Sequence, residues 1–118
     1  MAQKNNTLAP DCKLYILNKE GRKTFGKGPW LLLQKTEELG SLNKAAQSMD
    51  MAYSKAFRLI KDAEEAVGTP LLERRTGGKS GGGSSLTPAA REWMHKYTTW
   101  EQSVKEYMLA SYHDIFEE

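Results

Sequence analysis

The residues that first suggest chemistry form the glycine-rich stretch TGGKSGGGSS at 76–85, where Lys79 stands among five glycines. Glycines next to Lys-Ser are typical of loops that bind phosphate through backbone N–H groups. The phosphate loop of nucleotide-binding proteins also requires a glycine five residues before Gly78. That position is Glu73, whose carboxylate would repel a phosphate. The stretch is therefore weak evidence for a nucleotide-binding enzyme, and a linker or a turn is the alternative.

Other kinds of site have little support in the sequence. The single cysteine, Cys12, excludes an intrachain disulfide, and His95 and His113 are too far apart for metal-ligand spacing. The longest aliphatic run, 31–33, is much shorter than a membrane span, and the polar N-terminus lacks the apolar core of a signal peptide. We expect a cytoplasmic protein without a cofactor or catalytic activity, in which residues 1–12 form a flexible tail.

Charge is unevenly distributed along the 118 residues. Residues 1–90 hold 14 Lys and Arg against 9 Asp and Glu, whereas residues 91–118 hold 3 against 6. The net charge of +2 therefore hides a basic body and an acidic C-terminal part. Such a distribution suits a protein that contacts an anionic partner with its body. From charge alone, chance asymmetry on a solvated surface is an equally good explanation.

Apolar and turn-forming residues predict one small domain that is mainly α, with two small β-hairpins. The expected hairpins surround residues 19–21 and the glycine stretch, and the expected helices span residues 29–39, 41–49 and 52–67. Gly40 and Gly68 are suited to end helices, and Ser41 to cap the start of the second helix. In the third helix, one stripe should face the core; it comprises Ala56, Ile60, Ala63 and Val67.

A long helix is expected from Pro88 to the C-terminus, because Thr87-Pro88 is a strong helix start. Its large apolar residues alternate at spacings of four and three, which gives a heptad-like seam. The seam comprises Trp93, Tyr97, Trp100, Val104 and Tyr107. We predict that it forms a homodimer interface, and additional packing onto the domain core is the alternative.

This order of elements is the plan of a winged helix-turn-helix, in which a helix enters the DNA major groove beside a two-stranded wing. Asp50-Met51 joins the second and third helices tightly, and the small pair Ala45-Ala46 allows the second helix to pack closely beneath the third. If the glycine stretch were a linker, it would leave two fragments too small to bury their cores. We therefore interpret it as the tip of the wing.

The segment 40–93 resembles the DNA-binding domain of ModE-type molybdate-responsive transcriptional regulators and, more distantly, the LysR-type regulators. Shared features are the paired alanines, Gly-x-Pro-Leu at 68–71 and Glu-Arg at 73–74. The glycine-rich wing followed by LTPA, and the strand-bearing segment before the first helix, favour the ModE type. The resemblance implies a winged helix-turn-helix domain at 13–87 and a long dimerisation helix at 88–118.

Two departures from the ModE-type pattern affect the expectations. Ala52 stands where these regulators have serine, which removes a hydroxyl that could cap the third helix or contact phosphate, a role that Asp50 or Ser54 could take in part. The molybdate-binding repeats of the regulators follow the long helix, and nothing before Glu118 resembles them. We therefore expect no molybdate-sensing domain and no small-molecule effector site in this chain.

The resemblance implies that the third helix contacts base edges in the major groove. The predicted base contacts are Tyr53, Ser54, Lys55 and Arg58. Ordinary surface charge is the alternative for Lys55 and Arg58, and packing on the helix start is the alternative for Tyr53. With these contacts, a two-fold dimer would bind a palindromic operator on double-stranded DNA.

Phosphate contacts are predicted from two further places. At the N-terminus of the second helix, where free amides attract phosphate, they are Ser41, Asn43 and Lys44. In the wing they are Arg74, Arg75, Lys79 and Ser80. Ser41 could instead serve only as a cap, and Arg74 could pair with Glu73, so Arg75 and Lys79 are the better candidates. A winged-helix adaptor that binds only proteins is the rival hypothesis for the whole chain.

Overall fold

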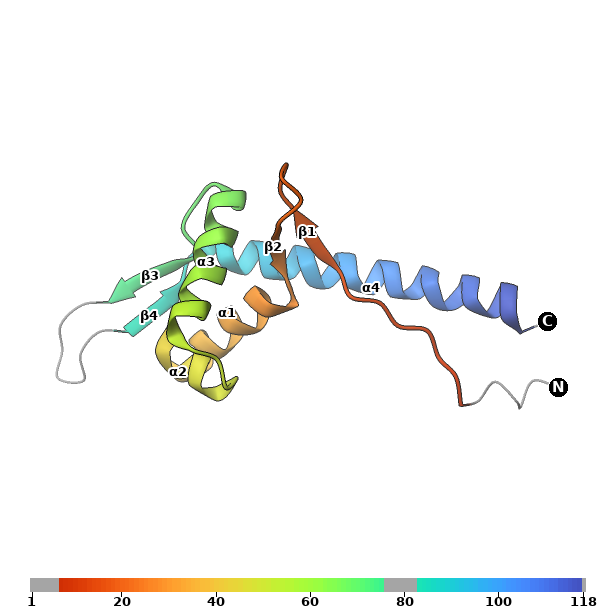
Figure 1. The fold of residues 1–118 in the computed structure, drawn as a ribbon, viewed down its shortest axis with the longest axis horizontal. Helices are drawn as coiled ribbons and strands as arrows, with labels where there is room; N and C mark the ends of the chain where they lie inside the picture. Colours follow the sequence, from red (N-terminus) through yellow and green to blue (C-terminus); the bar gives the residue numbers. More distant parts are fainter. Residues whose placement is uncertain (1–6, 76–82, 118) are drawn as a thin grey trace.

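The protein is described by a computed structural model over residues 7–75 and 83–117. Its elements, in chain order, are β1 (Tyr15–Leu17), β2 (Lys23–Gly26), α1 (Lys27–Leu39), α2 (Leu42–Ser48), α3 (Tyr53–Val67), β3 (Leu72–Arg75), β4 (Gly83–Leu86) and α4 (Pro88–Phe116). Helices α1, α2 and α3 and the two hairpins form a body, and α4 projects well beyond it (Figure 1). The fold is a winged helix-turn-helix with β3–β4 as the wing, as the sequence predicted.

Helices α1 and α2 form a tight pair because the chain reverses at Gly40. This glycine has φ 96°, in the left-handed region, and its N–H donates to the carbonyl of Thr36 at 2.8 Å. Ser41 then caps α2 through its Oγ, which accepts from the N–H of Lys44 at 3.1 Å. Ala45 and Ala46 are fully buried, so the small side chains allow the close packing that was expected of them.

The turn between α2 and α3 is equally compact. Asp50 adopts a positive φ of 53°, and the N–H of Met51 donates to the carbonyl of Ala46 at 2.9 Å. Helix α3 then places its predicted stripe toward the core, with three residues buried and the last, Val67, half-buried. Glu64 accepts from the N–H groups of Leu71 and Leu72, which fixes the entry into the wing.

Both hairpins are antiparallel ladders of two strands. In the wing, Leu72 pairs with Leu86 and Arg75 pairs with Gly83. Thr87 joins the wing to α4, because its Oγ1 donates to the carbonyl of Pro70 at 2.8 Å and accepts from the N–H of Ala90 at 3.1 Å. The start of α4 is therefore fixed directly to the strand pair.

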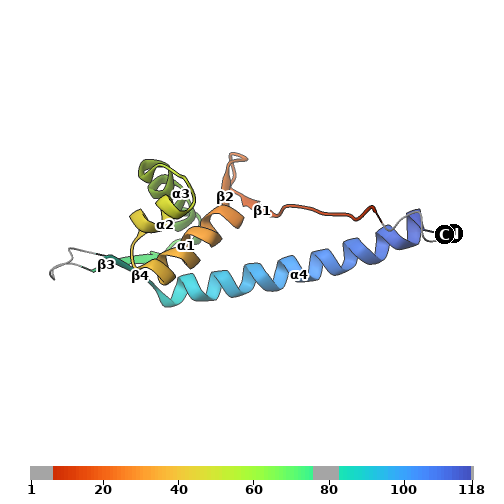
Figure 2. The same cartoon turned by 90° about the horizontal axis from the view of Figure 1, so that it is seen from below.

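The aromatic seam of α4 divides into two parts. Trp93 and Tyr97 each lie 5.7 Å from Phe25, measured between ring centroids, and Tyr97 is only 3% exposed. Tyr97 also donates its hydroxyl to the carbonyl of Leu14 at 2.9 Å. Tyr107, by contrast, is 77% exposed on the projecting half of the helix (Figure 2). Core packing, the alternative left open by the sequence, therefore accounts for the first part of the seam but not for the last.

Tyr97 predicts a specific pH dependence of folding. Burial, followed by the charges of Glu101 and Cys12, raises the pKa of its phenol above the ordinary value of about 10. A pKa raised in the folded state adds stability that is fully present below about pH 10 and is lost as pH rises through the folded pKa. Tyr97→Phe should lower the free energy of unfolding at pH 8 by about 1 kcal/mol, and stability should fall less steeply than in the wild type above pH 10.

Urea denaturation at several pH values measures this difference. Tyr107→Phe is the matched control, because its exposed ring should leave both the stability and the pH profile unchanged. Parallel profiles for wild type and Tyr97→Phe above pH 10 would contradict the assignment.

Candidate nucleic-acid interface

Helix α3 lies between the wing and the first hairpin. On the wing side, the hydroxyl of Tyr53 accepts from Arg74 at 3.4 Å. On the hairpin side, Asp62 pairs with Arg22 at 3.4 Å. These contacts fix which face of α3 remains outward.

Positive charge on the outward part of α3 is available to a partner. Ser54, Lys55 and Arg58 are exposed, and Tyr53 is 40% exposed. Among residues 7–75 and 83–117, neither Lys55 nor Arg58 takes part in an ion pair. Lys61 differs, because it pairs with Glu64 at 3.9 Å. The structure thus brings the four predicted base-contact residues to one end of α3, with both cations free.

The N-terminus of α3 has no side-chain cap. Ala52 occupies the cap position, and within the described residues no side chain bonds to the first amides there, so neither Asp50 nor Ser54 takes the capping role. A phosphate contact by either residue stays a prediction. At α2 the situation is reversed, because the Oγ of Ser41 already accepts from Lys44. Asn43 and Lys44 are exposed beside that cap.

The two arginines of the wing have different surroundings. Arg74 is exposed, and its only hydrogen bond within the described residues is the one to Tyr53. Arg75 is also exposed, but its side chain reaches across the wing, where its guanidinium donates to the carbonyl of Gly40 at 3.0 Å and to that of Ser84 at 3.4 Å. The alternative pairing of Arg74 with Glu73 does not occur in the structure. Lys79 and Ser80 lie outside the described residues.

Gly40 is the point where the wing meets the helices. Its carbonyl accepts from the N–H of Ser84 at 3.0 Å as well as from Arg75. A Cβ at Gly83 would lie 2.6 Å from this oxygen and 2.7 Å from the guanidinium. The sequence places Gly83 in the glycine-rich wing tip but carries no signal for this close approach, since nothing local links residues 40 and 83.

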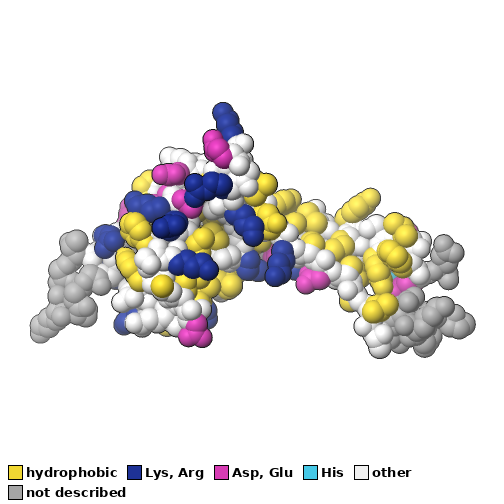
Figure 3. All heavy atoms as spheres, in the orientation of Figure 1, with side chains coloured by type: hydrophobic (Ala, Val, Ile, Leu, Met, Phe, Trp, Pro, Cys, Tyr) yellow, Lys and Arg dark blue, Asp and Glu magenta, His cyan; other side chains and the backbone are white. Residues whose placement is uncertain are grey.

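Basic side chains gather on one face of the body. Figure 3 shows Lys and Arg side chains over α3 and the adjoining hairpin, whereas apolar side chains dominate the projecting part of α4. A phosphate backbone is attracted to such a face, and the attraction decreases with salt.

The described part of the chain offers neither a metal-binding cluster nor a membrane-spanning helix. No three His, Cys, Asp or Glu side chains there are grouped so that they could hold a metal ion. The helices within residues 7–75 and 83–117 include none that is both long and apolar enough to cross a membrane.

Comparison with known proteins places this interface in context. Residues 30–91 match the bacterial regulatory helix-turn-helix proteins of the lysR family. The matched region runs from α1 through the wing into α4, so it contains the whole interface that the structure describes.

Several curated proteins are similar over the same region. The transcriptional regulator ModE of Haemophilus influenzae is 36% identical over 72 residues, which are 61% of this chain and 28% of the relative. The molybdenum transport protein ModE of Herbaspirillum seropedicae is 36% identical over 58% of this chain and 31% of its own length. The molybdenum-pterin-binding protein MopB of Rhodobacter capsulatus is 30% identical over 75% of this chain and 33% of its own length. The chain spans about three tenths of the length of these relatives.

The close approach at Gly83 predicts that a single methyl group will disturb the wing. Gly83→Ala should lower the free energy of unfolding by about 1–3 kcal/mol, because the added Cβ would clash with the carbonyl oxygen of Gly40, a backbone atom that cannot rotate away. Gly28→Ala is the matched control: no atom lies within 4 Å of its added Cβ, so stability should be unchanged or slightly higher. Urea denaturation measures both, and equal stability of Gly83→Ala and the wild type would refute the predicted contact.

Proposed function

Because the chain belongs to the lysR family of bacterial regulatory helix-turn-helix proteins, and is therefore a DNA-binding transcriptional regulator, we propose that it binds a palindromic operator as a homodimer. The observation that most supports this proposal is that Lys55 and Arg58, on the outward part of α3, have no ion-pair partner among residues 7–75 and 83–117. Its place of action would be the bacterial cytoplasm, and its role would be regulatory rather than enzymatic.

Helix α3 has the dimensions and chemistry for the major groove. Its 15 residues extend over about 22 Å, and a groove about 12 Å wide admits a helix. Lys55 and Arg58 can donate to the O6 and N7 acceptors of guanine, the commonest specific contact in such complexes. Tyr53 and Ser54 would contact neighbouring bases or sugars.

Phosphate contacts would position α3 in the groove. We assign them to Asn43 and Lys44 at the start of α2 and to Arg74 in the wing, all of which are exposed. Ser41 and Arg75 are already engaged in internal hydrogen bonds, so their phosphate contacts would require those bonds to be shared or replaced. Lys79 and Ser80 keep their proposed role at the wing tip.

The projecting half of α4 would form the dimer interface. Tyr107 is highly exposed, and Ile115, two turns further on the same side, is 65% exposed. Trp100 and Val104 connect this surface to the buried part of the seam, where Trp93 and Tyr97 lie. Large exposed apolar residues aligned on one helix are typical of protein–protein contacts.

The names of the relatives suggest the genes that are controlled. Two are named for molybdenum transport or molybdenum-pterin binding, and we propose that this chain likewise controls genes of molybdenum metabolism. How molybdate would influence it is left to experiment, because the similarity is confined to about three tenths of each relative.

Neutralising the two free cations tests the role of α3. Lys55→Ala with Arg58→Ala should weaken binding to an operator selected from random DNA by about 30-fold or more, since each guanine contact contributes about 1–3 kcal/mol. Affinity for random DNA should fall much less. The control, Lys35→Ala with Lys96→Ala, removes two lysines that already have partners on their own helices, Glu38 and Glu92.

Gel-shift titration at two salt concentrations measures the affinities of the wild type and of both double variants for operator and random DNA. An unchanged preference for the operator in the α3 variant would refute the assignment. If the wild type showed no salt-dependent binding to any DNA, the adaptor hypothesis would replace the regulator.

Introducing charged residues into the exposed part of the α4 seam tests whether the protein forms a dimer through this surface. Tyr107→Glu with Ile115→Glu should convert the protein from dimer to monomer, because two like charges would face each other in a dry interface. Gln102→Glu, on the opposite side of α4, should leave the dimer intact. Sedimentation equilibrium reports the mass directly, and a dimeric double variant would contradict the proposed interface.

A further inference from the structure

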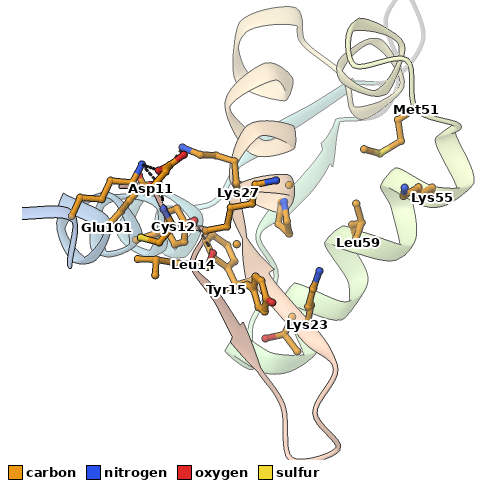
Figure 4. A pocket seen from close by; sticks show the side chains of 18 residues that line it. Asp11, Cys12, Leu14, Tyr15, Lys23, Lys27, Met51, Lys55, Leu59 and Glu101 are labelled. Atoms are coloured by element: carbon orange, nitrogen blue, oxygen red, sulfur yellow. Dashed lines mark hydrogen bonds and ion pairs between the residues drawn. The ribbon is translucent and has the colours of Figure 1, made fainter. Parts of the chain in front are cut away.

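A cleft of about 590 Å³ separates α3 from the first hairpin, and the DNA-binding proposal gives it no role. Figure 4 shows Met51, Lys55 and Leu59 along one wall, with Lys23 and Lys27 on the other side of the opening. The N-terminal segment and α4 close the remaining side. Its volume lies within the range of pockets that bind small organic ligands, about 300–1,000 Å³.

The inner surface of the cleft is apolar. Phe25, Pro29 and Tyr97 are buried residues that line it, and Met51 and Leu59 contribute half-buried side chains from the other wall. An aromatic or branched aliphatic group would exchange water for these surfaces, which is favourable. The inner surface of the cleft therefore favours a ligand with an apolar body.

The rim of the cleft is positively charged. Its lysines are Lys13, Lys23, Lys27, Lys55 and Lys105, and its carboxylates are Asp11 and Glu101. Both carboxylates are already paired: Glu101 lies 3.6 Å from Lys27 and 3.6 Å from Lys105, and Asp11 lies 3.8 Å from Lys105.

Three lysines of the rim therefore keep their charge available. Within the described residues, Lys13, Lys23 and Lys55 have no carboxylate partner, although Lys23 lies over the ring of Tyr15 at 4.5 Å. A cation would be repelled at this rim, and a neutral ligand would leave the lysines without a counter-charge. The chemistry that complements the cleft is an organic anion with an apolar body.

We propose that this cleft binds an apolar organic carboxylate and that its occupancy weakens DNA binding. The coupling acts through Lys55, which lines the cleft and also belongs to the proposed base-contact set. A carboxylate paired with Lys55 would remove that cation from the DNA surface. This proposal replaces the expectation that the chain has no small-molecule effector site. Its coupling to DNA rests on the proposed function, whereas binding to the cleft does not.

Anilinonaphthalene sulfonate is a suitable probe, because it is an aromatic anion whose fluorescence rises in apolar sites. The intact chain should bind it and should bind uncharged phenylnaphthylamine much more weakly. Lys55→Gln should weaken probe binding roughly tenfold, as expected for loss of a hydrogen bond to a charged group. Leu59→Gln should weaken probe binding because it places a polar group on the apolar inner surface of the cleft. Lys23→Gln tests the charge of the rim a second time, at an exposed position.

Two controls separate the cleft from other apolar surfaces. Leu109→Asn and Phe116→Ser change exposed apolar residues of α4 away from the proposed dimer seam and should not alter probe affinity. The proposal is overturned if those α4 variants abolish binding, if the neutral analogue binds equally well, or if all three cleft variants keep wild-type probe affinity. Circular dichroism confirms that each variant is folded before its affinity is interpreted.

The link to DNA is measured separately. Saturating operator DNA should lower probe affinity in the wild type, and by thermodynamic reciprocity the probe should lower operator affinity by the same factor. Probe binding without any such coupling would refute the regulatory part and leave the cleft site standing. Absence of probe binding beside normal operator binding would refute the cleft and leave the proposed function intact.

Discussion

The geometry of the interface depends on one backbone oxygen, the carbonyl of Gly40. Gly40 ends α1 in a left-handed turn, and its carbonyl accepts hydrogen bonds from both strands of the wing, through the side chain of Arg75 and the N–H of Ser84. Because both strands of the wing are hydrogen-bonded to this oxygen, the orientation of the wing relative to α1 and α2 is restricted. Gly83 is required next to it, since a side chain there would occupy the same space.

Helix α3 contacts the wing at one end and the first hairpin at the other, and it exposes Lys55 and Arg58 on its outward face. Tyr53 contacts the wing through Arg74, and Asp62 contacts the first hairpin through Arg22. Lys55 lies where two surfaces meet: it belongs to the proposed DNA contacts and also to the rim of the cleft. A regulator built in this way could respond to a small anion without a separate sensing domain, because a single side chain would be shared by both ligands.

Most of the fold could be predicted because its signals are local. Gly40, Ser41 and Thr87 mark helix ends through their own backbone and side-chain chemistry, and those positions agree with the structure. Long-range contacts could not be predicted in this way. The hydrogen bond of Arg75 to Gly40 joins residues 35 positions apart, and buried Tyr97 donates to the carbonyl of Leu14, 83 positions away. The cleft has no local signal either, because four separate segments of the chain line it.

The central claim is that α3 contacts base edges in the major groove. Protection of guanine N7 from methylation by dimethyl sulfate tests this claim most directly, because N7 is accessible only in that groove. On an operator selected from random DNA, we predict that the wild-type protein protects guanines in two half-sites whose centres are one helical turn, or a whole number of turns, apart. Binding with no guanine protected at N7 would contradict the account, since α3 would then lie outside the major groove.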